Sequence, residues 1–157
     1  VQTPAMLFMI LAAAALFGHA VTIIRLPIEI VEQVTAIGLS PDLFIFVVML
    51  LVLLLGMFLE TISIILITTP IVFPVMIALG IDPIWYGILL MINLELALIT
   101  PPVGMNLFVI KGIAKAPLSD VIRGALPYAT LMLLGLIIVF AFPALATWLP
   151  RVAGFGG

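Results

Sequence analysis

Long apolar runs, separated by short polar or proline-containing breaks, dominate the pattern along the chain. The first run, Ala5–Ile24, has about 20 residues, the length that crosses a hydrocarbon core of roughly 30 Å. Arg25 and Pro27 end this run, and Ile28–Gly38 then mixes acids and an amide with apolar residues at helical spacing. We therefore expect residues 1–40 to form a transmembrane helix followed by an amphipathic interfacial arm.

Residues 41–80 are predicted to form a re-entrant helical hairpin. Ser40-Pro41-Asp42 has the pattern of an N-cap, a first-turn proline and an acid near a helix N-terminus, so a helix should run from there to about Leu59. Thr69-Pro70 repeats the cap followed by a proline, which predicts a second, short helix over Pro70–Leu79. At 1.5 Å per residue that helix would be about 15 Å long, half of a bilayer.

A pair of prolines interrupts the next apolar run. Asp82-Pro83 starts a helix that must stop near Ile99, because Pro101 and Pro102 lack backbone donors and each restricts the residue before it. A broken span leaves backbone groups unpaired at membrane depth, so the break at Thr100–Gly104 must face protein, water or an ion. Residues 81–116 therefore read as a broken transmembrane helix, a feature that marks substrate and ion sites in secondary transporters.

The last apolar run, Pro127–Leu149, predicts a C-terminal transmembrane helix within residues 117–157. The segment Lys111–Arg123 before it has three cations and one acid, whereas the connector Arg25–Asp42 has one cation and three acids. Positively charged loops stay in the cytoplasm. The sequence therefore places Lys111–Arg123 on the cytoplasmic side of the membrane and the connector Arg25–Asp42 on the outer side.

Composition agrees with a membrane location. Hydrophobic residues make up 66% of the 157 residues and charged residues 8%, and one soluble core of this size cannot hide that much apolar surface. The net charge of −2, with five Lys and Arg residues, offers no basic face. The lipid bilayer is thus an expected partner, and nucleic acid is not.

The common enzyme motifs are missing from the sequence. It has no His-Glu-x-x-His metal pair, no Gly-x-Ser-x-Gly elbow and no Gly-x-x-x-x-Gly-Lys phosphate loop. The absence of cysteine removes thiolate metal sites and thiol nucleophiles. We expect a protein that is not an enzyme and has no cofactor, and that takes transport energy from an ion gradient or from another subunit.

The broken helix is the candidate for an ion site. A site for an organic anion needs positive electrostatic potential, but every Lys and Arg lies at the edge of a segment. The remaining sources of positive potential are the helix N-termini at Pro70 and Val103 and a bound cation. Sodium suits carbonyl and hydroxyl oxygens, and Thr100, Val103 and Gly104 can offer carbonyls. The expected metal is therefore sodium alone, held at the break.

The hairpin should supply the other side of this site. Hydroxyls can come from Thr61, Ser63 and Thr69, and glycine at positions 56 and 104 lets the backbone approach closely. The candidate sodium and substrate residues are Gly56, Glu60, Thr61, Ser63, Thr69, Thr100, Pro101, Val103, Gly104 and Asn106.

Four polar residues at membrane depth have alternative roles. Glu60 and Glu95 can bind a cation, relay a proton, or have only a structural role, accepting a hydrogen bond in the protonated form. Asn93 and Asn106 flank the break and can either satisfy its freed backbone groups or touch a substrate. The sequence leaves these alternatives open.

Four motifs in one order resemble the large membrane subunit of TRAP transporters, the tripartite ATP-independent periplasmic uptake systems. They are Leu55-Gly56-Met57-Phe58-Leu59-Glu60, Thr69-Pro70-Ile71-Val72-Phe73-Pro74, Gly80-Ile81-Asp82-Pro83 and Ile99-Thr100-Pro101-Pro102-Val103-Gly104-Met105-Asn106-Leu107-Phe108, and Arg123-Gly124-Ala125-Leu126-Pro127-Tyr128 continues the match.

The resemblance implies an all-α, multi-pass protein of the bacterial inner membrane. It further implies the second inverted repeat of a sodium-coupled elevator transporter, which takes organic acids such as dicarboxylates or sialic acid from a periplasmic binding protein and works with a small membrane subunit. Gly56–Ser63 would be the tip of its second hairpin, facing the unwound break Thr100–Gly104. Ala97 stands where many members have glycine. Family members are more than twice as long, so the chain resembles their C-terminal part.

Two other readings compete with this one. Another carrier of the wider ion-transporter group, such as a sodium/proton antiporter or a citrate carrier, uses similar hairpins and broken helices. A non-transporting, truncated membrane scaffold is the third reading. Co-purification of a periplasmic binding protein would favour the first reading over the second.

Overall fold

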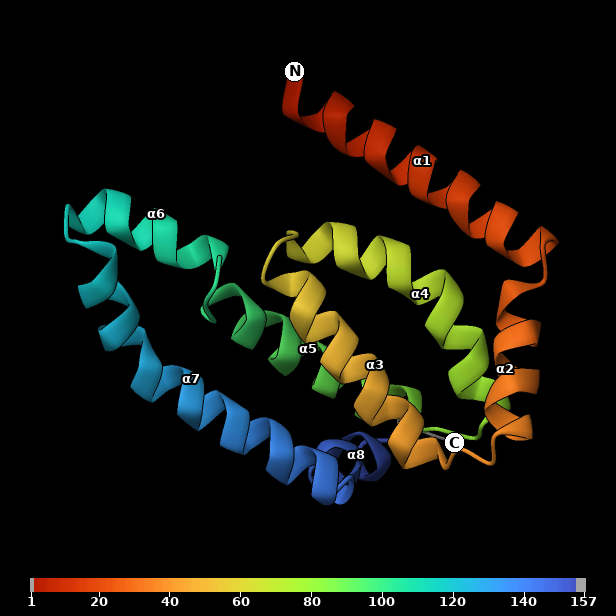
Figure 1. Cartoon of the computed structure of the whole chain (residues 1–157). Helices are drawn as coiled ribbons and strands as arrows, with labels where there is room; N and C mark the ends of the chain where they lie inside the picture. The colour runs from red at the N-terminus through yellow and green to blue at the C-terminus, as the bar shows by residue number, and fades with distance from the viewer. Residues whose placement is uncertain (1, 155–157) are drawn as a thin grey trace.

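The computed structural model describes the backbone of residues 2–154 and the side chains of residues 8–154, and this part of the chain is helical without strands. Figure 1 shows α1 and α2 on one side of a central group formed by α3, α4 and α5, with α7 running along the other side. The helices are α1 (Gln2–Ile23), α2 (Leu26–Ala36), α3 (Pro41–Gly56), α4 (Thr61–Ala78), α5 (Pro83–Leu98), α6 (Met105–Ala114), α7 (Leu118–Ala141) and α8 (Ala144–Val152).

The first two helices form a bent arm. Arg25 has a left-handed φ of 58°, and the axes of α1 and α2 differ by 53° at this point. α1 lies against α4 so closely that a Cβ added to Gly18 would be 3.4 Å from the ring of Pro70. The start and end of α1 agree with the predicted apolar run to within a few residues.

α3 and α4 form a helical hairpin. Ser40 caps α3, because its Oγ accepts a hydrogen bond from the backbone N–H of Leu43 at 3.3 Å. The helix ends at Gly56, one turn before the predicted end at Leu59. It stops earlier because the chain must turn at Met57–Leu59 to allow the next helix to begin at Thr61.

The predicted helix start at Thr69-Pro70 is wrong, since both residues lie inside α4. A proline within a helix removes one N–H and crowds the preceding turn, and α4 accommodates Pro70 and Pro74 by curving (Figure 1). Packing of α1 and α2 against α4 favours the continuous helix. Consequently the N-terminal end of α4 lies at the hairpin tip, and no helix N-terminus occurs at Pro70.

α5 and α6 are the two halves of the predicted broken helix. Asp82 caps α5, with its Oδ1 accepting from the N–H of Ile84 at 2.8 Å and of Trp85 at 3.3 Å. α5 ends at Leu98, and α6 begins at Met105 after the proline pair. The sequence therefore located both sides of this break.

The predicted final helix over Pro127–Leu149 is also wrong in extent, because α7 stops at Ala141 and α8 follows as a separate helix. Pro143 has no N–H to give to the Val139 carbonyl one turn earlier. The indole of Trp85 donates to that carbonyl instead, at 2.9 Å. The tertiary hydrogen bond thus uses the acceptor that the proline leaves free.

An ion pair joins α8 to the start of α5. Nη2 of Arg151 lies 3.2 Å from Oδ2 of Asp82. Partial burial acts to raise the pKa of Asp82, but hydrogen bonds from the N–H groups of Ile84 and Trp85 and the nearby Arg151 outweigh it, so the pKa lies below its ordinary value. Asp82 is therefore charged at neutral pH.

The outside of the structure is apolar. The best-buried side chains, such as Ile45, Val52 and Leu89, lie where α3 packs on α5, whereas much of α7 is exposed and hydrophobic. By length and composition α4 and α7 can each cross a membrane, and α1 with α2 can do so as a bent pair. The chain has the architecture of an all-helical membrane protein.

Candidate functional site

The hairpin tip and the break in the α5–α6 helix are in direct contact. The backbone N–H of Gly104 donates to the carbonyl oxygen of Met57 at 3.2 Å. Met57 belongs to the tip between α3 and α4, so this bond joins the two segments that the sequence predicted to face one another. The tip and the break therefore form one continuous region of irregular backbone.

Next to this region, α3 packs closely on α5. A Cβ on Gly56 would lie 2.5 Å from the Cβ of Ala97, which is fully buried. Real Cβ atoms do not approach that closely, so the crossing of α3 over α5 requires glycine at position 56 as long as alanine occupies position 97. The methyl group of Ala97 takes up the space that glycine leaves.

Two carbonyl groups converge beside Gly104. A Cβ on this residue would be 3.0 Å from the oxygen of Thr100 and 3.1 Å from the oxygen of Leu98, and its φ is +53°. In a continuous helix the Leu98 carbonyl would accept from residue 102, but Pro102 has no N–H. The Thr100 carbonyl would accept from Gly104, whose N–H donates to Met57 instead. The break thus presents two oxygens without their helical partners.

Other polar groups near the break have local partners. The Thr100 hydroxyl donates to the Leu96 carbonyl, which leaves its oxygen lone pairs available to a cation. Val103 and Asn106 are partly buried, whereas Pro101 is exposed. Carbonyl and hydroxyl oxygens are ligands that suit a hard cation, so this face of the break can hold one.

On the hairpin side, Glu60 is the cap of α4. Its Oε1 accepts hydrogen bonds from the Ser63 N–H at 3.0 Å and from the Ser63 hydroxyl at 2.8 Å. A carboxylate at a helix N-terminus is stabilised by the free N–H groups and the helix dipole. Of the roles left open for Glu60, the geometry therefore supports the structural one, with Thr61 and Ser63 partly buried next to it.

Thr69 does not lie in this region. It lines a groove between α1 and α4 together with Gly18 and Pro70. It is on the third turn of α4, away from the tip, because the helix begins at Thr61 and not at Pro70. The structure thus separates Thr69 from the other candidate residues.

Asn93 serves the packing of α3 on α5. Its Nδ2 donates to the carbonyl of Met49 on α3 at 2.8 Å, and its Oδ1 is buried without a donor among the described residues. Asn93 therefore does not satisfy the backbone of the break, which was one of its two predicted roles. Glu95, two residues further along α5, is exposed.

Sequence reasoning missed two backbone groups of this region, the carbonyls of Met57 and Leu98. Apolar side chains give no sign that a main-chain oxygen is used. The prolines did carry a signal for Leu98, since a proline at position i frees the carbonyl of residue i−4. No comparable signal exists for Met57, because its bond to Gly104 spans 47 residues and depends on the fold.

The comparisons with known proteins agree on one family. The model of the family described as "Tripartite ATP-independent periplasmic transporter, DctM component" matches residues 1–145. The C4-dicarboxylate TRAP transporter large permease protein DctM of Vibrio cholerae is 46% identical over 147 residues, which are 94% of this chain and 32% of the relative. The protein of the same description from Pseudomonas aeruginosa is 47% identical over 149 residues, 95% of this chain and 35% of the relative.

A more distant relative has another substrate in its name. The sialic acid TRAP transporter large permease protein SiaM of Vibrio cholerae is 31% identical over 157 residues, which are 99% of this chain and 37% of the relative. The chain spans about a third of the length of these curated relatives. All of them are transporter permeases and none is an enzyme.

Proposed function

Because the chain belongs to the family of TRAP transporter large permeases, we propose that it forms the C-terminal transport segment of a sodium-coupled importer of organic acids. The observation that carries the proposal is the junction between the Gly104 N–H and the Met57 carbonyl, beside the converging oxygens of Leu98 and Thr100. Such a junction gives a cation oxygen ligands from the break, with the hairpin tip next to it.

We assign sodium to the break, with the carbonyls of Thr100, Val103 and Gly104 as the original candidate ligands and that of Leu98 added. The bound cation and the N-terminal end of α6 at Gly104 supply positive potential for a substrate carboxylate. Sodium binding and substrate binding are then coupled, because the substrate anion binds more tightly when the cation is present.

The proposed substrate is a C4-dicarboxylate. This choice rests on the names of the two relatives with 46 and 47% identity, whereas the sialic acid relative is 31% identical. The proposed partners are a periplasmic substrate-binding protein and a small membrane subunit, and the proposed location is the bacterial inner membrane. Although α4 is long enough to cross a membrane, the hairpin α3–α4 would be re-entrant, because its tip contacts the break between α5 and α6. It would move with α5 and α6 as part of an elevator.

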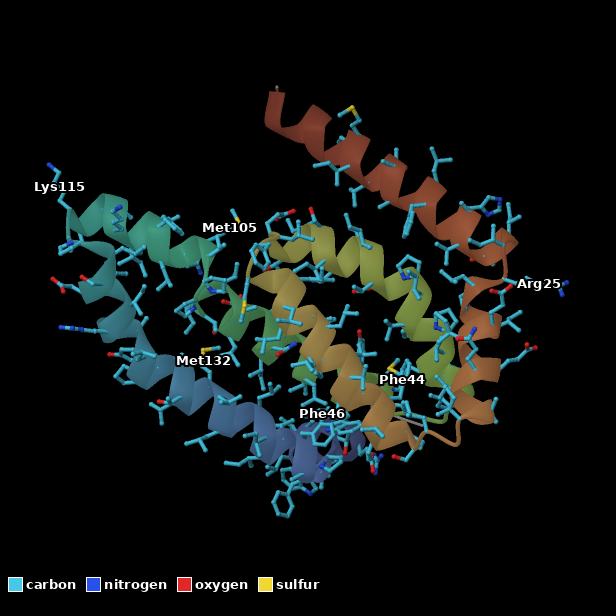
Figure 2. The ribbon with its side chains drawn as sticks, viewed as in Figure 1. Arg25, Phe44, Phe46, Met105, Lys115 and Met132 are labelled. Carbon is cyan, nitrogen blue, oxygen red and sulfur yellow. The ribbon has the colours of Figure 1, made fainter. Side chains whose placement is uncertain are left out.

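The orientation in the membrane follows from charge. Figure 2 shows Arg25 at the turn between α1 and α2 and Lys115 at the turn between α6 and α7, at opposite ends of the molecule. We propose that the end with Lys115 faces the cytoplasm and the connector Arg25–Asp42 faces outward. The two ends of the hairpin, near Ser40 and Gly80, then lie on the outer side.

The test is sodium-driven uptake of succinate by the complete transporter in proteoliposomes, with the binding protein and the small subunit present. Gly104→Val places a branched side chain against the Thr100 and Leu98 oxygens and forces a residue with Cβ to adopt φ +53°. We expect the sodium concentration for half-maximal uptake to rise about tenfold or more, equivalent to about 1.4 kcal/mol.

The matched control is Gly112→Val, because nothing lies within 4 Å of a Cβ at Gly112 on α6. Both variants should insert into the membrane normally. An unchanged sodium dependence in Gly104→Val would remove the break from the ion site. Uptake without the binding protein would favour another kind of carrier.

The 157-residue chain alone should insert but not transport. Inverted-repeat carriers form their site between two repeats, and this chain supplies one hairpin and one broken helix. Sodium-driven uptake by this chain alone would contradict the proposed two-repeat site. No uptake even when the chain is joined to the rest of the permease would support the scaffold reading.

A further inference from the structure

α8 presents an apolar stripe that no other described helix covers. Leu145, Trp148, Leu149 and Val152 are each between 63 and 69% exposed. They follow one another at positions i, i+3, i+4 and i+7, which lie on one face of a helix. The opposite face carries Ala146 and Thr147, which are 6 and 3% exposed and pack toward α5.

The helix is too short to cross a membrane. Its nine residues give about 14 Å at 1.5 Å per residue, whereas the hydrocarbon core is roughly 30 Å thick. α7, which is long enough to cross a membrane, ends at Ala141, and α8 begins as a separate helix at Ala144, so α8 is not the last part of α7.

Charged groups indicate the depth of α8 in the bilayer. The ion pair between Arg151 and Asp82 joins it to the start of α5, and the Trp85 indole joins α5 to the end of α7. Figure 1 shows α8 near the end of the molecule where α2 leads into α3 and α4 leads into α5. The charged Asp82 at the start of α5 and its partner Arg151 on α8 belong near the headgroups rather than in the hydrocarbon core.

We propose that α8 lies flat in the headgroup and acyl boundary of the bilayer, with its stripe inserted and Trp148 as the aromatic anchor. α7, the helix before it in the chain, likewise exposes apolar side chains, with Leu131, Leu134 and Ile138 about half exposed or more. Tryptophan at such a position has its ring in the apolar zone and its N–H among the headgroups. Through the Asp82–Arg151 pair, α8 fixes the height of the outer ends of α5 and α7.

Spin-label depth measurements test this geometry, since the chain has no native cysteine. Single labels at Leu145→Cys, Leu149→Cys and Val152→Cys, in the 157-residue chain in phosphatidylethanolamine and phosphatidylglycerol bilayers, report depth from collisions with oxygen and with a water-soluble nickel chelate. Because α8 is parallel to the surface, we expect one shallow depth for all three labels.

The matched control is the pair Leu131→Cys and Ile138→Cys on α7, which have the same seven-residue separation as positions 145 and 152. For a membrane-crossing helix their depths should differ by about 10 Å at 1.5 Å per residue. A similar difference along α8 would overturn the proposal, as would labels reached only by the nickel chelate, or by neither probe because protein covers them.

Fluorescence of Trp148 gives a second readout without a label. The difference between the unmodified chain and Trp148→Phe should be quenched more by lipids brominated near the headgroup end of the acyl chain than near its methyl end. Stronger quenching by the deeper bromines would contradict the interfacial position. Neither measurement uses sodium or a substrate, so failure of the proposed transport function leaves this test intact.

Discussion

At the scale of single residues, the contact between Gly56 and Ala97 determines how closely the hairpin approaches the broken helix. We predict that Gly56→Ala destabilises the protein by about 1–3 kcal/mol, the usual cost of overpacking a tight contact. The physical reason is the 2.5 Å separation that the two Cβ atoms would have. Reversible unfolding in mixed micelles measures the effect.

The companion variant is Ala97→Gly, which should cost about 0.5–1 kcal/mol because glycine weakens a helix interior. In the double variant the two residues exchange roles, so most of the loss caused by Gly56→Ala should be recovered. Losses that simply add in the double variant would show that the two positions do not compete for the same space.

At the scale of helices, Pro143 separates α7 from α8. We predict that Pro143→Ala extends α7 through residues 142–145, because the restored N–H can pair with the Val139 carbonyl. That carbonyl now accepts from the Trp85 indole, so the two donors would compete. Backbone chemical shifts of residues 140–146 in micelles report the change in helicity.

Pro127→Ala is the matched comparison, since Pro127 already lies inside α7 and its replacement should leave the helix boundaries unchanged. Non-helical shifts that persist at residues 142 and 143 in Pro143→Ala would mean that the packing of α8 on α5, and not the proline, ends α7.

At the scale of the whole molecule, the orientation of the two ends is the property most open to a direct test. We predict that Lys115→Cys reacts with a membrane-impermeant maleimide from the cytoplasmic side and Gln33→Cys from the outer side. Both positions are exposed, and the positive-inside rule places them on opposite sides. Labelling of position 115 from the outside alone would reverse the topology.

The sequence by itself determined the helices whose ends are set locally. Ser40 and Asp82 are capping residues followed by proline, and the pair Pro101-Pro102 removes two donors in succession. Each of these signals acts within one turn of helix, so no knowledge of the fold is needed to read it. The membrane character likewise follows from composition, and the family follows from four motifs in order.

Only the tertiary structure decided the effect of a single proline and the partners of main-chain groups. A single proline removes one hydrogen bond, and the surrounding packing determines whether the helix continues, as at Pro70 against α1, or ends, as at Pro143 beside the Trp85 indole. The hydrogen bond from the Gly104 N–H to the Met57 carbonyl likewise depends on the tertiary structure. Such contacts join residues far apart in the chain, and the apolar side chains at their ends do not encode them.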